Sequence, residues 1–295
     1  MLFEVIPPIV ADVAADPAWM AEFAATAEQV GFDGIVLPEH VAWVLSETTA
    51  FEHDGQRAVT GPTTMYPDPL EVLAYLAGRT SRLTLATGIL VLPQHHPVVL
   101  AKRLATLDVL SGGRARIGVG VGWNPDEMRL CGQDFASRGR RADEAIAVMR
   151  TLWSGPPSEP SSFRGGFYAF EGVYCNPKPV RGQVPIHIGG SSRAAAVRAG
   201  RLGDGFQPLN LRGDALRERL DQVRAAAEQA GRAPEAVELT IRAAMSDLDP
   251  ASVREAAADG VTRLVVNGSP TADLGVAVGE LKSFADRMEL ALAAH

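Results

Sequence analysis

Short apolar runs alternate with longer amphipathic stretches along the whole chain. The runs are rich in aliphatic and β-branched residues, which is typical of strands buried on both faces. Eight strands are predicted, at Phe3–Ile6, Gly34–Leu37, Leu83–Leu92, Arg116–Gly120, Val184–Ile188, Asp204–Leu209, Val237–Arg242 and Arg263–Asn267. A helical pattern follows each of them, so the sequence indicates a parallel sheet.

Capping and stop residues set the expected helix boundaries. Asp16 can cap the first helix, Pro17 suits its first turn, and Gly31 can end it. The other helical stretches are Leu70–Arg79, Val98–Leu110, Ala142–Trp153, Arg193–Arg201, Ala215–Ala230, Ala251–Asp259 and Asp273–Leu290. This alternation predicts an α/β fold, a closed (β/α)8 TIM barrel, with a doubly wound open sheet as the alternative.

One domain is expected to span residues 1–295, with two long connections added to the barrel. Val41–Tyr66 is a polar loop after the second strand, and residues 155–183 are an insertion between the fourth helix and the fifth strand. A helix-to-strand connection lies at the amino-terminal face, so we expect a short hairpin that closes the barrel floor or supports a dimer. Its aromatic residues are Phe163, Phe167, Tyr168, Phe170 and Tyr174.

Charge, hydropathy and cysteine spacing together exclude several classes of binding partner. Lys and Arg number 28 against 35 Asp and Glu, a net charge of −7, which argues against non-specific nucleic-acid binding. No apolar run approaches the length of a membrane span, and the amino terminus carries an acid where a signal peptide has basic residues. Cys131 and Cys175 lack the spacing of a zinc site. We expect a cytoplasmic protein without membrane or nucleic-acid partners.

His40 is the strongest candidate for catalysis. It follows the second strand directly and so lies at the carboxyl-terminal mouth, where barrel enzymes carry their chemistry and an imidazole can relay a proton. The alternative is a half-buried histidine satisfied by the backbone. Glu39 can either orient the imidazole or point into the barrel wall, and Asp126 and Glu127 are reserve acids. His95 and His96 are adjacent, and side chains of adjacent residues on an extended chain point in opposite directions. The pair therefore does not predict a site in which both bind one metal ion.

Three glycine-containing segments also end strands at this mouth. Gly189-Gly190-Ser191-Ser192 precedes a helix and can bind an anion, although a tight turn with a serine cap explains it equally well. Gly118–Trp123 has GxGxG spacing, so it indicates close approach of a flat ligand or rim packing rather than a dinucleotide fingerprint. Thr87-Gly88-Ile89 interrupts the third strand and indicates a bulge.

The order of these segments resembles the luciferase-like flavin and deazaflavin oxidoreductases, most closely the bacterial branch that uses coenzyme F420. The resemblance covers nearly the whole chain. It is carried by Gly31–His40, Tyr66–Pro69, Leu85–Gly88, Gly118–Asn124, Asp143-Glu144, Leu152-Trp153, Asn176–Pro179, Gly189-Gly190 and Gly203–Phe206.

The resemblance implies a set of site residues. His40 would lie by the reactive ring, Gly88 and Ile89 would form a cis-peptide bulge behind it, and Gly120 and Gly122 would flank it. Gly189, Gly190, Ser191 and Ser192 would hold the cofactor phosphate, and the other cofactor contacts are Glu39, Thr87 and Trp123. Relatives that oxidise a sugar phosphate place a glutamate acid where this chain has Trp123, which argues against that substrate.

The function predicted on this basis is hydride transfer between F420 and a small organic substrate, with His40 moving the proton. The resemblance also implies a homodimer. An FMN-dependent monooxygenase working with a separate reductase is the alternative. A flavin-binding protein without turnover and a phosphate-binding barrel isomerase are two further hypotheses.

Overall fold

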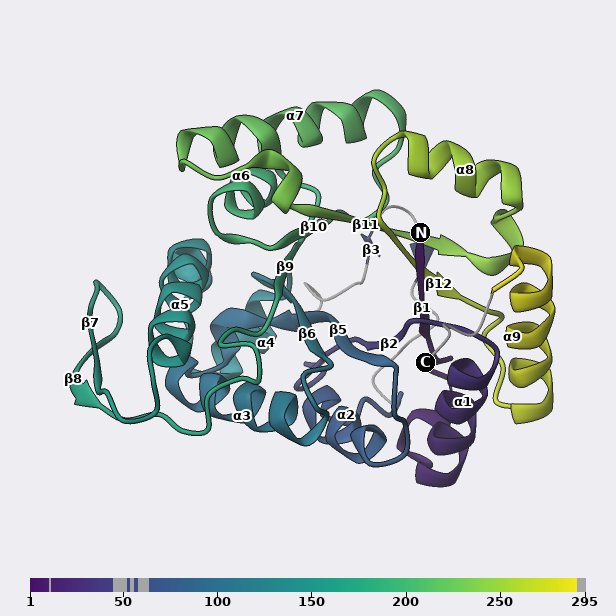
Figure 1. The fold of residues 1–295 in the computed structure, drawn as a ribbon, viewed down its shortest axis with the longest axis horizontal. Coiled ribbons are helices and arrows are strands. Elements are labelled where there is room, and N and C mark those ends of the chain that lie inside the picture. The colour runs from purple at the N-terminus through teal and green to yellow at the C-terminus, as the bar shows by residue number, and fades with distance from the viewer. Residues whose placement is uncertain (11, 45–51, 54–55, 58–63, 291–295) are drawn as a thin grey trace.

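The computed structural model describes residues 1–10, 12–44, 52–53, 56–57 and 64–290. Eight parallel strands close into a barrel, and the last of them pairs with the first (Figure 1). They are β1 (Leu2–Ile6), β2 (Gly34–Leu37), β5 (Thr84–Val91), β6 (Ala115–Gly120), β9 (Ile186–Gly189), β10 (Gly205–Gln207), β11 (Glu238–Ala244) and β12 (Arg263–Asn267). The predicted TIM barrel is confirmed, and the open sheet is wrong.

Helices surround the barrel (Figure 1). They are α1 (Pro17–Gln29), α2 (Pro69–Ala77), α3 (Pro97–Leu110), α5 (Arg138–Trp153), α6 (Arg193–Leu202), α7 (Gly213–Gln229), α8 (Pro250–Ala258) and α9 (Leu274–Met288). The Asp16 side chain caps α1 as predicted, accepting hydrogen bonds from the Ala18 and Trp19 amides. The sequence analysis missed α4 (Pro125–Leu130), because six residues are too few to show helical periodicity.

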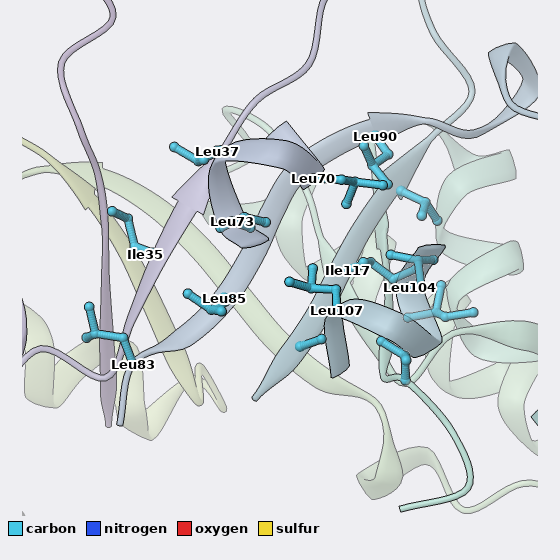
Figure 2. Packing of buried hydrophobic residues seen from close by; sticks show 14 of the residues in the cluster. Ile35, Leu37, Leu70, Leu73, Leu83, Leu85, Leu90, Leu104, Leu107 and Ile117 are labelled. Atoms are coloured by element: carbon cyan, nitrogen blue, oxygen red, sulfur yellow. The ribbon is translucent and has the colours of Figure 1, made fainter. Parts of the chain in front are cut away.

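Alternation along the strands produces two apolar cores. Ile35, Leu85 and Ile117 point outward and pack beneath helices, where Leu73 of α2 and Leu104 of α3 meet them (Figure 2). The residues that face the barrel interior form a smaller buried cluster, Ile6, Val36, Ala86 and Val265. The strands are therefore apolar on both faces, as a parallel barrel requires.

Charged side chains fill the barrel below this inner cluster, toward the amino-terminal ends of the strands. Glu4 is 0% exposed and accepts hydrogen bonds from the guanidinium groups of Arg116 and Arg263, which are also buried. Gly34 makes room for them, since a Cβ atom there would lie 2.8 Å from Glu4 Oε1. This ionic cluster closes the barrel floor.

His187 belongs to the same floor, although the sequence offered no partner for it. Its Nδ1 lies 3.4 Å from Thr240 Oγ1, and its Nε2 lies 3.7 Å from a carboxylate oxygen of Glu238. Burial, followed by the positive charges of Arg116 and Arg263, lowers the pKa of His187 well below the usual histidine range. His187 is therefore neutral in the folded protein.

The insertion at 155–183 forms the predicted hairpin, from β7 (Ser161–Arg164) and β8 (Ala169–Val173). Figure 1 shows it beside α5 on the outside of the barrel, and Glu144 of α5 accepts hydrogen bonds from the amides of residues 166–168. The prediction that it closes the floor is wrong, because the strands supply that closure themselves. Its role in a dimer stays a prediction.

Within the long loop after β2, the structure describes the short antiparallel pair β3 (Glu52–His53) and β4 (Gln56–Arg57). The rest of the predicted loop, at 45–51, 54–55 and 58–63, lies outside the described residues. The segment from Thr64 leads into α2, which the Asp68 side chain caps.

Candidate active site

His40 lies at the carboxyl-terminal mouth of the barrel, as predicted, and aromatic side chains surround it. Trp43 stacks on the imidazole at 4.4 Å between ring centroids, Tyr66 meets it edge-on at 5.2 Å, and Trp123 lies at 6.2 Å. The His40 side chain is 14% exposed. The site thus presents one titratable ring in an apolar, aromatic setting.

Glu127 holds the other side of the imidazole. One carboxylate oxygen lies 3.3 Å from His40 Nδ1, and the other accepts hydrogen bonds from the Val41 amide at 2.6 Å and the Ala42 amide at 3.4 Å. Asn124 caps α4 by accepting from the Glu127 amide, which fixes the backbone that carries this carboxylate. A carboxylate from α4 therefore clamps both the imidazole and the loop that bears it.

The ionisation of Glu127 sets the proton arrangement of His40. Burial opposes ionisation, but hydrogen bonding and the charge interaction with His40, together with the two loop amides, lower the pKa of Glu127 below its ordinary value. An ionised carboxylate accepts the Nδ1 proton, so Nε2 carries the free lone pair when the ring is neutral. Among the residues described, Nε2 has no hydrogen-bond partner. Glu127 therefore acts on His40, whereas the sequence analysis treated it as a reserve acid.

Glu39 faces away from His40 and makes a second carboxylate–imidazole pair. Its Oε2 atom accepts a hydrogen bond from the Val91 amide at 2.7 Å, and its Oε1 atom lies 2.9 Å from His95 Nε2. Of the two alternatives for Glu39, orienting His40 is wrong, because its side chain is 3% exposed and bonds to the barrel wall through the Val91 amide of β5 and to His95. Its contact with a cofactor stays a prediction. His95 and His96 do not converge, since His96 contacts Tyr168 instead. The described residues contain no cluster that could hold a metal ion.

The predicted bulge in the third barrel strand is present. The Gly88–Ile89 peptide is cis, and the register with β6 shifts between Thr87 and Leu90. Thr87 is buried and donates its hydroxyl proton to the Gly118 carbonyl, so it secures the bulge, and its contact with a cofactor stays a prediction. The Ile89 side chain packs against Gly120 and Gly189, which end β6 and β9.

Two glycines that the resemblance assigns to the cofactor, Gly120 beside the ring and Gly189 at the phosphate, make room for Ile89. A Cβ atom at Gly120 would lie 2.7 Å from Ile89 Cδ1, and one at Gly189 would lie 2.6 Å from Ile89 Cγ2. Gly122 adopts φ 78°, a conformation that favours glycine. The rim-packing interpretation is therefore confirmed for Gly120, and its contact with a cofactor ring stays a prediction.

The Gly189–Ser192 segment forms a helix cap with one surrounding cation. Ser192 Oγ accepts from the Ala195 amide at 3.2 Å, which confirms the serine-cap interpretation. Ser191 Oγ accepts from the Leu209 amide at 3.0 Å and donates to the Leu209 carbonyl. Arg219, which the sequence analysis missed, donates from Nε to the Ser191 carbonyl at 3.0 Å. A phosphate here would meet the amides that begin α6, beside Arg219, whose guanidinium also pairs with Glu218 at 2.8 Å.

Comparison with known proteins agrees with this arrangement. The profile of the luciferase-like monooxygenase family matches residues 4–294. The chain belongs to that family. No helix in the described part of the chain is long and apolar enough to cross a membrane.

Similar sequences include both unassigned and named proteins. An "uncharacterized protein" of Mycobacterium tuberculosis (strain ATCC 25618 / H37Rv) is 35% identical over 170 residues, 57% of this chain and 59% of that protein. The F420-dependent glucose-6-phosphate dehydrogenase of Microbacterium testaceum (strain StLB037) is 32% identical over 194 residues, 64% of this chain and 52% of that protein. The enzyme of the same name from Amycolatopsis mediterranei (strain U-32) is 30% identical over 239 residues, 78% and 65% of the two chains. The chain therefore spans less than two thirds of these relatives' own length.

Solved structures share the whole barrel. An F420-dependent secondary alcohol dehydrogenase in complex with an F420–acetone adduct superposes with a TM-score of 0.77 at 17% identity, covering 97% of this chain and 98% of that one. The monooxygenase RslO1 from Streptomyces bottropensis gives a TM-score of 0.75 at 22% identity, covering 98% and 99%. At these identities the likeness shows the fold alone.

Proposed function

We propose that this protein is an F420-dependent oxidoreductase that transfers a hydride between the deazaflavin and a small organic substrate. The observation that carries the proposal is the Glu127-bound imidazole of His40, which lies with an aromatic wall at the mouth of a luciferase-like barrel. Sequence relatives at 30% and 32% identity that are named as F420-dependent enzymes favour the deazaflavin.

The residues present fit such a cofactor. The apolar Ile89 side chain packs over Gly120 and Gly189, where any Cβ atom would clash with it, and would support the flat ring. The amides that begin α6 and the Arg219 guanidinium would hold the phosphate. When bound, the deazaflavin accepts or donates the hydride.

The protein residues transfer the proton that accompanies the hydride. Oxidation of an alcohol removes a hydride from carbon and a proton from oxygen, and His40 Nε2 takes that proton; in reduction it returns the proton. Glu127 stabilises the imidazolium that forms, because its carboxylate faces Nδ1. Trp43, Tyr66 and Trp123 exclude water around the ring.

Parallel titrations with F420 and with FMN test the proposal. We expect F420 to bind more tightly, and a panel of alcohols or carbonyl compounds to change its absorbance. Tighter binding of FMN would favour a monooxygenase supplied by a separate reductase. Binding of F420 without any redox change would favour a storage protein, and affinity for neither cofactor would favour a phosphate-binding isomerase.

A further inference from the structure

Arg242 is a cation at the barrel mouth that the proposed hydride transfer does not use. Along β11, Thr240 faces the interior and contacts His187, so Arg242, two residues later, lies on the same face and nearer the mouth. Its Nε lies 3.4 Å from the Oδ1 atom of Asn267, at the end of the neighbouring strand β12. The two side chains together form a polar corner of the mouth.

Among the residues that the structure describes, the charge of Arg242 has no carboxylate counterpart. No Asp or Glu in the described part of the chain forms an ion pair with Arg242, whereas Arg116 and Arg263 at the floor share Glu4. The Arg242 side chain is exposed, and desolvation by the surrounding protein lowers the pKa of its guanidinium. The group stays protonated at neutral pH.

His40 and this polar corner face the same mouth, because His40 follows β2, Arg242 lies toward the end of β11, and both strands belong to one closed barrel. Tyr66 meets the imidazole edge-on at 5.2 Å, and the charge of its phenol raises the pKa of the Arg242 guanidinium. A ligand that covers Tyr66 can therefore reach both the imidazole and the guanidinium.

We propose that Arg242 and Asn267 bind the carboxylate of an organic acid substrate whose reactive carbon lies at His40. A carboxylate matches the planar guanidinium with two oxygens, and its single negative charge balances one arginine. Trp43, Tyr66 and Trp123 offer aromatic area to the rest of such a molecule. The assignment of the reactive carbon rests on the proposed function, whereas the anion site does not.

Three probes of similar shape test the anion site on the full chain without cofactor. Benzoate, benzamide and phenyl phosphate are titrated by calorimetry. We expect benzoate to bind at least tenfold more tightly than benzamide, and added sodium chloride to weaken benzoate alone. Equal affinity for benzoate and benzamide would overturn the proposal, and tighter binding of phenyl phosphate would overturn the choice of a carboxylate.

Matched variants locate the effect. Arg242→Gln should abolish the preference for benzoate, Arg242→Lys should restore part of it, and thermal melting verifies that both variants fold. Arg217→Gln is the control, because Arg217 is an exposed arginine of α7 paired with Asp214. Retention of the preference in Arg242→Gln would refute the site.

The dissociation constant of F420 separates this proposal from the proposed function. We expect Arg242→Gln to keep it within twofold of wild type. A large loss of F420 affinity in this variant would assign Arg242 to the cofactor and overturn the substrate site. If wild type binds benzoate selectively but does not bind F420, the anion site stands and the proposed function fails.

Discussion

At the barrel floor Glu4 is fully buried between two arginines, whereas at the mouth Glu127, 2% exposed, binds an imidazole on a loop. Both carboxylates lie inside protein and both have hydrogen-bond partners. They differ in whether the partner keeps a polar atom that is free to bind another group. At the floor the ion pairs lie within the barrel, but at the mouth His40 Nε2 has no partner among the described residues.

His187 and His40 show the same contrast for one residue type. His187 is 1% exposed and lies close to two arginines, so the folded protein keeps it neutral. His40 has a carboxylate on one nitrogen and aromatic rings around it, which suits a group that gains and loses a proton. The floor residues therefore stabilise the fold and the mouth residues carry the chemistry. Substitutions at the floor should lower stability, and substitutions at the mouth should lower turnover.

His40→Ala is expected to have the largest effect. General acid–base catalysis contributes roughly a hundred- to ten-thousand-fold, so turnover should fall by that factor while the affinity for F420 stays within a few-fold. His40→Asn, which cannot relay a proton near neutral pH, should be nearly as slow. Steady-state rates with both variants provide the measurement. Wild-type turnover in both, where chemistry limits the rate, would reduce His40 to a contact.

Glu4→Gln tests the floor. Loss of the carboxylate leaves two buried guanidinium groups short of negative charge, so the free energy of unfolding should fall by about 3 to 5 kcal/mol. Denaturant titration followed by circular dichroism measures this loss. The folded variant should keep the F420 affinity of wild type. Unchanged stability would show that Glu4 is not essential to the floor.

Glu127→Gln tests the mouth with the same chemical change. The amide keeps the shape but cannot stabilise an imidazolium, so kcat should fall roughly 10- to 100-fold, as for other partners that orient a functional histidine. Asp126→Asn on the same helix is the control, because Asp126 pairs with Arg129. An equal loss in Asp126→Asn would attribute the effect to disturbance of α4 rather than to the contact with His40.

The sequence predicted the parts of this comparison that depend on local pattern. Apolar runs and capping residues such as Asp16 placed the strands and helices, and the rule that barrel chemistry lies at strand ends placed His40. The glycine in the third strand predicted the bulge, and the family resemblance added the cis peptide between Gly88 and Ile89. These features need only neighbouring residues or a known pattern.

Contacts between distant strands could not be predicted in this way. Glu127 meets His40 across 87 positions, and Glu4 meets Arg263 across 259. Arg242 shows no signal in the sequence, because a strand-end arginine is ordinary until its neighbours are known. Closure of the barrel brings these residues together, through strand register at the floor and through the loops and α4 at the mouth.

Stability at acidic pH should reveal the floor histidine. Because burial and two arginines lower the pKa of His187, the unfolded chain binds its proton first as the pH falls. The free energy of unfolding is therefore unaffected by His187 above about pH 6.5, the ordinary histidine pKa. Below that pH, His187 lowers the free energy of unfolding by up to about 1.4 kcal/mol per pH unit. His187→Asn should make unfolding curves between pH 7 and pH 5 less dependent on pH. An unchanged dependence would contradict a neutral His187.

The smallest expected effect separates the two serines of the predicted phosphate site. Ser192 caps α6, so Ser192→Ala should cost about 1 kcal/mol of stability, and its hydroxyl proton stays free to meet a phosphate. Ser191 already donates its proton to the Leu209 carbonyl. F420 affinity should therefore fall by up to about tenfold in Ser192→Ala, the strength of one hydrogen bond, and less in Ser191→Ala. Fluorescence titration measures both variants, and a larger loss in Ser191→Ala would mean that the phosphate binds on the Leu209 side of the loop.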